Sequence, residues 1–133
     1  MDNSEKMKQW LAERDIVNLE MIVADMAGVA RGKLQPTAQL STKSMKLPIA
    51  IFAQSINSDF HMPRENVTDR DMNLQPDVDT LRHVPWATEP TASVLMDCYD
   101  IDGQSVETSP RTVLIRVVER FAEHGWTPIV APE

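Results

Sequence analysis

Acidic side chains are the groups in this sequence best suited to bind a metal ion. Four aspartates lie close together in a polar stretch: Asp69, Asp71, Asp77 and Asp79. Their spacing does not match the calcium-binding EF-hand loop, and the closing glutamate of that loop is absent. A solvated turn rich in aspartate is the competing interpretation. A further acid, Glu133, follows the β-prone run TPIVAP, at the point where a strand would present its carboxylate.

The segment GVARGK at residues 28–33 has the composition of a phosphate-binding loop but not its spacing. A P-loop places four residues between its first glycine and the GK pair, and Ser or Thr follows. Here three residues intervene and Leu34 follows. The segment is therefore predicted to be one strand of a hairpin, with the charged ends of Arg31 and Lys33 facing solvent or an acidic partner.

Histidine and cysteine supply no recognisable catalytic or metal-binding set. His61, His83 and His124 lack the spacing of metal ligands, and Cys98 is the only cysteine. A CxxC pair and a disulfide framework are therefore excluded within this sequence, and no Cys/His or Ser/His/Asp set can be assembled from it. His124 lies beside the end of a predicted helix, where a cation suits the helix dipole.

Length and composition favour one soluble globular domain. The chain has 133 residues, of which 42% are hydrophobic and 25% are charged. A formal net charge of −7 argues against nucleic-acid binding, which needs clustered Lys and Arg. The first ten residues lack the apolar core of a signal peptide, and no stretch approaches a membrane span. We therefore expect a cytoplasmic protein, with Trp10, Trp86 and Trp126 packed in its core.

Short elements must position these residues. The predicted strands are residues 17–26, 29–36, 47–56, 81–86, 91–100 and 127–133. The first two form a hairpin across the turn at residues 25–28. Residues 4–14 are predicted to form a helix capped by Ser4. The polar, proline-containing stretch between residues 57 and 80 is predicted to be a long loop.

The clearest element is a helix at residues 110–124. Ser109 occupies its N-cap, Pro110 its first turn and Gly125 the position after its C-terminus. One apolar face is expected to cover the sheet, and it comprises Val113, Leu114, Val117, Val118 and Phe121. The predicted fold class is α+β, a mixed sheet of about four or five strands packed on one long helix.

Three segments, taken in order, resemble the N-terminal domain of the glutamine synthetase family. The hairpin VADMAGVARGKLQP resembles the pattern D-x-x-G-x-x-R-G-K-x-x-P, which is typical of the amine-glutamylating branch. DMNLQPDVDTLRHVPW resembles D-M-x-L-x-P-D-x-x-T followed by Pro-Trp. The stretch from VLMDCYD to the final glutamate resembles C-D-x-x-x-x-D-G, P-R-x-x-L, G and E in succession. The resemblance covers residues from about 16 to 133 and is closest to γ-glutamylpolyamine (γ-glutamylputrescine) synthetase.

This resemblance implies a fold and an activity. Residues 1–133 would form the β-grasp domain that precedes the catalytic domain in this family. The family's ATP-dependent reaction phosphorylates glutamate on its γ-carboxyl group, and an amine then displaces the phosphate. ATP and Mg²⁺ (or Mn²⁺) would be bound mainly by the catalytic domain. Such proteins commonly form dodecameric rings, with each active site between one catalytic domain and a neighbouring N-terminal domain.

The resemblance assigns few site residues to this chain. Glu133 matches the first glutamate of an E-x-E strand that coordinates the metal, and Asp71 matches an acid near the amine pocket. In glutamine synthetase a D-G-S-S aspartate binds and deprotonates ammonium, and Ala53 aligns with it here. Gln54 and Ser55 are the adjacent candidates for lining that pocket. Because ammonium needs a carboxylate partner, Ala53 favours an organic amine or polyamine as substrate.

Three alternatives stay open from the sequence. The first is an ammonia-using glutamine synthetase. The second is a non-catalytic relative that serves in ring assembly or binding, and the third is a free-standing β-grasp binding module. A carboxylate two positions beyond Glu133 would favour a catalytic protein.

Overall fold

The computed structural model describes residues 3–40, 45–57, 59 and 70–131. Its helices are α1 (Asn3–Ala12) and α2 (Pro110–Glu123). Its strands are β1 (Asn18–Ala24), β2 (Ala30–Pro36), β3 (Met45–Pro48), β4 (Asp71–Pro76), β5 (Arg82–His83) and β6 (Thr91–Tyr99). The short 3₁₀ helices η1 (Thr37–Gln39), η2 (Ile49–Ala53) and η4 (Val78–Thr80) connect them.

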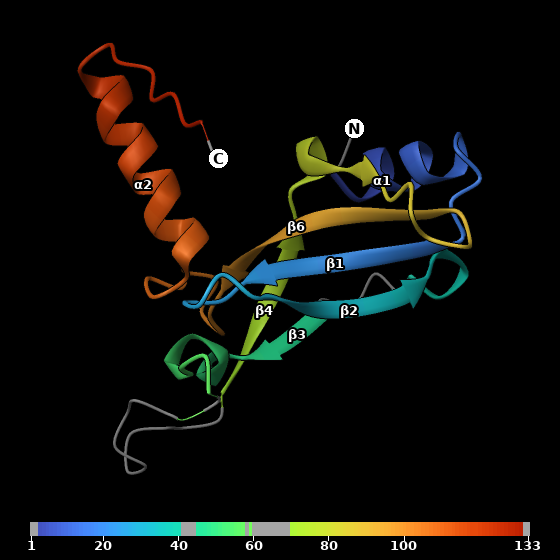
Figure 1. Ribbon diagram of the computed structural model, residues 1–133, viewed down its shortest axis with the longest axis horizontal. Coiled ribbons are helices and arrows are strands. Elements are labelled where there is room, and N and C mark those ends of the chain that lie inside the picture. The colour runs from blue at the N-terminus through green and yellow to red at the C-terminus, as the bar shows by residue number, and fades with distance from the viewer. Residues whose placement is uncertain (1–2, 41–44, 58, 60–69, 132–133) are drawn as a thin grey trace.

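The strands form one mixed sheet in the order β2-β1-β6-β4-β3, with β5 paired to β6 (Figure 1). β1 runs parallel to β6, whereas the other pairs are antiparallel. The sheet curls into a nearly closed barrel. Across the gap between its two edge strands, the Lys33 Nζ on β2 donates to the Lys46 carbonyl on β3 at 3.3 Å. The α+β class is confirmed, and the arrangement is consistent with a β-grasp domain.

The core lies between the concave side of the sheet and α1. β1 and β6 alternate buried and more exposed residues, as expected for strands with one apolar face. The buried members on the strands are Leu19, Met21, Val23, Met72, Leu74, Ala92, Val94, Met96 and Cys98. Met7 and Leu11 of α1 join them, separated by the four residues that place two side chains on one helix face.

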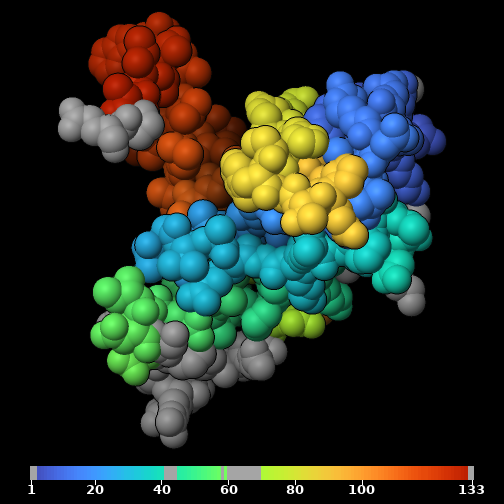
Figure 2. Space-filling model, turned by 45° about the vertical axis from the view of Figure 1, so that its right-hand side comes forward, coloured from blue at the N-terminus to red at the C-terminus, as the bar shows by residue number. Residues whose placement is uncertain are grey.

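The second helix does not cover the sheet, so the prediction that it does is wrong for the described chain. Its two ends are as predicted: Ser109 precedes it, Pro110 begins it, and Gly125 ends it with a φ of 70°. Its apolar side chains are exposed, at 59% for Leu114 and 44% for Val117. α2 stands away from the rest of the molecule (Figures 1 and 2), and the core cluster contains Met7 and Leu11 of α1 but no residue of α2.

Two predicted strands are shorter than the sequence suggested. In the segment 47–56 the strand ends at Pro48, because proline has no N–H to donate to the ladder, and η2 follows. In the segment 81–86 only Arg82–His83 is a strand, and Pro85 lies two residues beyond its end. The predicted strand at 127–133 is also wrong, because residues 127–131 adopt no strand and the last two residues lie outside the described chain.

The predicted loop between residues 57 and 80 contains a strand. β4 alternates Met72 and Leu74, both buried, with more exposed polar residues, and that period of two was present in the sequence. Trp10 packs against the core as predicted, but Trp86 and Trp126 are exposed. None of the described helices is long and apolar enough to cross a membrane.

Candidate functional site

The segment predicted to line an amine pocket is η2 and the turn after it. Ala53 is the last residue of η2, and Gln54 is extended. The Ser55 Oγ accepts hydrogen bonds from the backbone N–H groups of Asn57 and Asp59, each at 3.2 Å. The Ser55 N–H donates in turn to the Asp59 carbonyl at 2.8 Å. Ser55 therefore stabilises this turn, while the predicted contact of Ala53 and Gln54 with an amine stays a prediction.

Asp71 lies beside the start of the same segment. It is the first residue of β4, and its partner in the ladder is Pro48, the residue that precedes η2. The N–H of Ile49 donates to the Arg70 carbonyl at 2.9 Å. The structure thus brings Asp71 close to the first turn of η2, although the two are more than twenty positions apart in the sequence. Asp71 is exposed to solvent.

The other predicted acids do not gather with Asp71 in the described chain. Asp69 and Glu133 lie outside the described residues, so the metal-ligand prediction for Glu133 stays a prediction. Asp77 caps η4, where its Oδ1 accepts from the Asp79 N–H at 3.2 Å. The described residues contain no group of three or more His, Cys, Asp or Glu that could hold a metal ion.

A hollow of about 430 Å³ opens next to η2, and sequence reasoning missed it. We call it the α2–η2 hollow, and it is lined by Met26, Phe52, Thr108, Pro110 and Val113. These residues come from the β1–β2 turn, from η2 and from the start of α2, which meet at one end of the sheet (Figure 1). The lining is mostly apolar, and Phe52 immediately precedes Ala53.

Asp25 is the charged residue buried most deeply among the described ones, and it organises the β1–β2 turn. Its Oδ1 accepts from the N–H groups of Ala27 (2.9 Å) and Val29 (2.8 Å), and its Oδ2 pairs with the Arg31 Nε at 2.8 Å. Burial raises the pKa of this carboxyl group, but the Arg31 guanidinium and the two N–H donors outweigh burial, so the pKa lies below its usual value.

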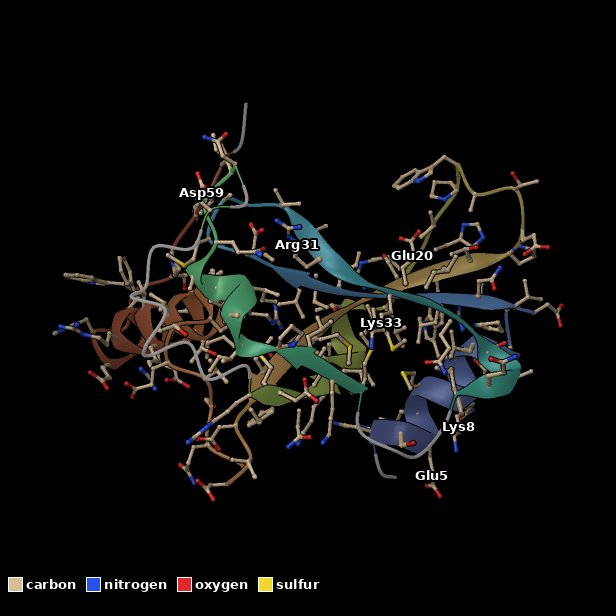
Figure 3. All side chains as sticks on the ribbon, turned by 90° about the horizontal axis from the view of Figure 1, so that it is seen from below. Glu5, Lys8, Glu20, Arg31, Lys33 and Asp59 are labelled. Atoms are coloured by element: carbon tan, nitrogen blue, oxygen red, sulfur yellow. The ribbon has the colours of Figure 1, made fainter. Side chains whose placement is uncertain are left out.

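Both basic side chains of β2 have hydrogen-bond acceptors within the chain. Arg31 pairs with Asp25, and Lys33 donates to the Lys46 carbonyl. Figure 3 shows both side chains on β2, with Glu20 on the neighbouring strand β1. The prediction that the charged ends face solvent or an acidic partner is wrong for Arg31, whose guanidinium pairs with Asp25, whereas Lys33 is exposed as predicted.

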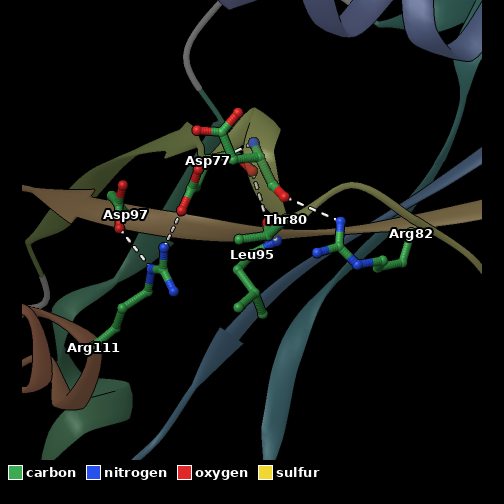
Figure 4. Close-up of polar contacts among 7 residues, drawn as sticks. Asp77, Thr80, Arg82, Leu95, Asp97 and Arg111 are labelled. Carbon is green, nitrogen blue, oxygen red and sulfur yellow. Dashed lines mark hydrogen bonds and ion pairs between the residues drawn. The ribbon is translucent and has the colours of Figure 1, made fainter. Parts of the chain in front are cut away.

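Arg111 connects the first turn of α2 to the sheet. Its Nε donates to the Asp97 Oδ1 on β6 at 2.8 Å, and its Nη2 pairs with the Asp77 carboxylate (Figure 4). Just before α2, Ser109 is buried and its hydroxyl group hydrogen-bonds the Cys98 thiol. Burial raises the pKa of Cys98 to about 11, so this thiol is neutral and is not a nucleophile. We call Asp77, Asp97 and Arg111 the Arg111 cluster.

Comparison with known proteins gives the family context of this geometry. No protein-family model matches the chain. Over 97% of its length the chain is 28% identical to glutamine synthetase of Thermotoga maritima and 30% identical to gamma-glutamylethanolamide synthetase of Streptomyces coelicolor. This chain is similar to the N-terminal region of glutamine synthetase-family proteins. It spans 28% and 29% of the length of these two relatives.

Solved structures of glutamine synthetase-like proteins share the fold. One described as a GmaS/ADP complex has a TM-score of 0.66 and 23% sequence identity, and the match covers 89% of this chain and 26% of the other. At that identity the likeness establishes the fold alone.

Proposed function

We propose that this chain is the N-terminal part of an ATP-dependent glutamate–amine ligase of the glutamine synthetase type. Glutamate would be activated as γ-glutamyl phosphate, and an amine would displace the phosphate. The support is sequence similarity along almost the whole chain to two relatives that are both named as synthetases. The chain spans less than a third of the length of either relative. We therefore assign the binding sites for ATP and glutamate, and most of the metal ligands, to the remaining part of a longer protein.

The exposed face of α2 is the structural observation that carries this proposal. Its apolar residues are Val113, Leu114, Ile115, Val117, Val118 and Phe121. At about 100° per residue they span roughly 200° of the helix surface, which leaves a narrower stripe of Arg116, Glu119, Arg120 and Glu123. A helix that is apolar around most of its circumference is normally buried inside a domain. We therefore assign α2 to the contact with a larger catalytic part.

The acceptor is proposed to be an organic amine rather than ammonia. Ala53 has no carboxylate to stabilise ammonium, and the α2–η2 hollow, which the preceding residue Phe52 lines, has mostly apolar walls. A polyamine such as putrescine would place its distant ammonium group near acids such as Asp71. The similarity to gamma-glutamylethanolamide synthetase supports an organic acceptor, whereas the similarity to glutamine synthetase keeps ammonia as the second candidate.

The proposed metal role of Glu133 rests on the family resemblance. Carboxylate oxygen is the ligand that Mg²⁺ and Mn²⁺ prefer. The described residues do not by themselves form a metal site, so we derive no catalytic step from one. In a longer protein, Glu133 would be one ligand among several. The ring of neighbouring subunits expected for this family is likewise a proposal for the longer protein.

Phosphate release tests the assignment. The 133-residue chain should show no ATP- and glutamate-dependent phosphate release with any amine, because it lacks most of the proposed ligands. A chain extended to the length of its relatives should release phosphate only when ATP, glutamate and an amine are all present. Activity of the short chain above a contamination control would contradict the proposal. An extended chain inactive with every amine and with ammonia would favour a non-catalytic relative.

A further inference from the structure

α2 is attached to the sheet almost entirely through its first turn. Beyond Arg111 its apolar residues are exposed by 37–59% in this chain, so packing within the chain does little to fix the direction of the helix. The polar link is the Arg111 cluster, together with the buried Ser109. A second ion pair, Arg116 with Glu107 at 3.2 Å, involves more exposed side chains. Exposed ion pairs contribute little to stability.

Both acceptors of the Arg111 guanidinium are rigidly held. Asp97 lies within β6, opposite Gln75 of β4. The Asp77 N–H donates to the Leu95 carbonyl at 2.9 Å, and the Asp77 carbonyl accepts from the Thr80 hydroxyl group at 2.7 Å. Figure 4 shows the guanidinium between the two carboxylates. The planar guanidinium donates in fixed directions, so two fixed acceptors specify its orientation.

We propose that Arg111 is a positioning residue that sets the direction in which α2 leaves the sheet, and with it the width of the α2–η2 hollow. Pro110 and Val113 line the hollow from α2, on either side of Arg111 in the sequence, and Phe52 lines it from η2. A change in the direction of α2 therefore moves one wall of the hollow relative to the other. The two acceptors, Asp97 in β6 and Asp77 directly after β4, stay in place.

The positioning role has a consequence for substrate choice that rests on the proposed ligase function. Phe52, the residue before Ala53, lines the hollow, and the mostly apolar lining suits the alkyl part of an organic amine. Arg111 would thus control how well this part of the amine fits. ATP and glutamate, assigned to the remaining part of the protein, should depend on Arg111 much less.

Spin labels test the positioning role in the chain itself, without any assumption about activity. One label is attached to a cysteine that replaces Glu20 on β1, and the other to a cysteine that replaces Glu119 on the polar stripe of α2. Cys98 is buried with a raised pKa, so it should stay unlabelled at neutral pH. The distance distribution between the labels should be narrow in the parent chain and clearly broader in Arg111→Gln. Arg116→Gln, the matched control, should leave it narrow.

A second variant keeps this test decisive if Arg111→Gln fails to fold. Asp97→Asn weakens one acceptor and leaves the guanidinium paired with Asp77, so it should broaden the distribution to an intermediate degree. Arg111→Lys keeps the positive charge but loses the planar guanidinium that donates to both carboxylates. It should also broaden the distance distribution to an intermediate degree. Distributions as narrow as that of the parent chain in these variants would overturn the proposal. Equal broadening in Arg116→Gln would also overturn it.

Kinetics in the extended ligase test the consequence for substrate. Arg111→Gln should raise the KM for an alkyl amine by about tenfold or more, since small displacements of positioning groups have large effects on rate and binding. The KM for ATP should stay close to its original value, and Arg116→Gln should change neither. A parallel rise in both KM values would show that Arg111 acts only on general stability. If the extended protein has no ligase activity, the proposed function fails, whereas the spin-label result still decides the positioning role.

Discussion

At the scale of single residues, Asp25 makes the stability of the hairpin depend on pH. Its pKa is depressed in the folded chain below the ordinary value of 3.8. A carboxyl group whose pKa is lower in the folded state than in the unfolded state stabilises the fold while it is ionised. This stabilisation is fully present above the unfolded-state pKa and is lost as pH falls through the folded-state pKa. The free energy of unfolding should therefore decrease below about pH 4, and Asp25→Asn should reduce that decrease. Urea unfolding at a series of pH values measures it.

A matched substitution separates Asp25 from the general effect of acid. Asp102 lies in an exposed turn, so Asp102→Asn should leave the pH dependence close to that of the parent chain. If Asp25→Asn and Asp102→Asn have the same slope, the Asp25–Arg31 pair does not govern acid stability.

Gly32 is required by the close approach of β1 and β2. A Cβ atom at this position would overlap the carbonyl oxygen of Met21 on the neighbouring strand. Gly32→Ala should therefore destabilise the chain by about 1–3 kcal/mol or more, the usual cost of overpacking. Gly28 offers a comparison, because a Cβ there meets no atom within 4 Å, although its φ is 75°. Thermal unfolding should show the larger loss for Gly32→Ala, and the reverse order would contradict the described strand contact.

The residues of the candidate site were predicted unevenly from the sequence. Asp71 and the segment containing Ala53 came from the family resemblance, and the structure pairs Asp71 with Pro48, the residue before η2. The Arg111 cluster was missed because its acids are 14 and 34 positions from Arg111, and only the fold brings them together. The α2–η2 hollow was missed for the same reason.

At the scale of elements, local patterns predicted the ends of segments better than their packing. The hairpin and the boundaries of α2 followed from turn chemistry and capping residues, which act over a few positions. The prediction that α2 covers the sheet was wrong. An apolar stripe indicates that some partner buries that face of a helix, but it does not identify the partner. β4 was overlooked because its polar exposed face made the segment resemble a loop.

The exposed face of α2 leads to a comparison of two leucines. In this chain Leu114 is 59% exposed, whereas Leu19 of β1 is fully buried. Leu114→Ala should change the free energy of unfolding by no more than about 0.5 kcal/mol, as for most surface substitutions. Leu19→Ala should cost about 2–5 kcal/mol, as for core truncations. Urea unfolding of both variants decides this, and similar losses would mean that α2 packs on the sheet after all.

At the scale of the whole molecule, the proposed choice of acceptor amine in the extended ligase can be tested at one position, Ala53. In the proposed ligase, Ala53 would offer no charge to hold ammonium, whereas an organic amine would gain contacts with the apolar hollow. The ratio of kcat/KM for putrescine or a simple alkyl amine to that for ammonia should therefore exceed one. Ala53→Asp should lower this ratio, because a new carboxylate stabilises ammonium close to the reacting position.

The matched control for this substitution is Ala50→Asp, which adds the same charge to η2 three positions earlier. A carboxylate there should change the kcat/KM ratio much less, because position 53, and not position 50, is the one proposed to match the ammonium-binding aspartate of glutamine synthetase. Steady-state rates with both amines, measured on the parent ligase and both variants, separate a local contact from a general effect of charge. A parent enzyme that prefers ammonia would rule out the organic-amine assignment, and the glutamate–ammonia ligase would then be the better description.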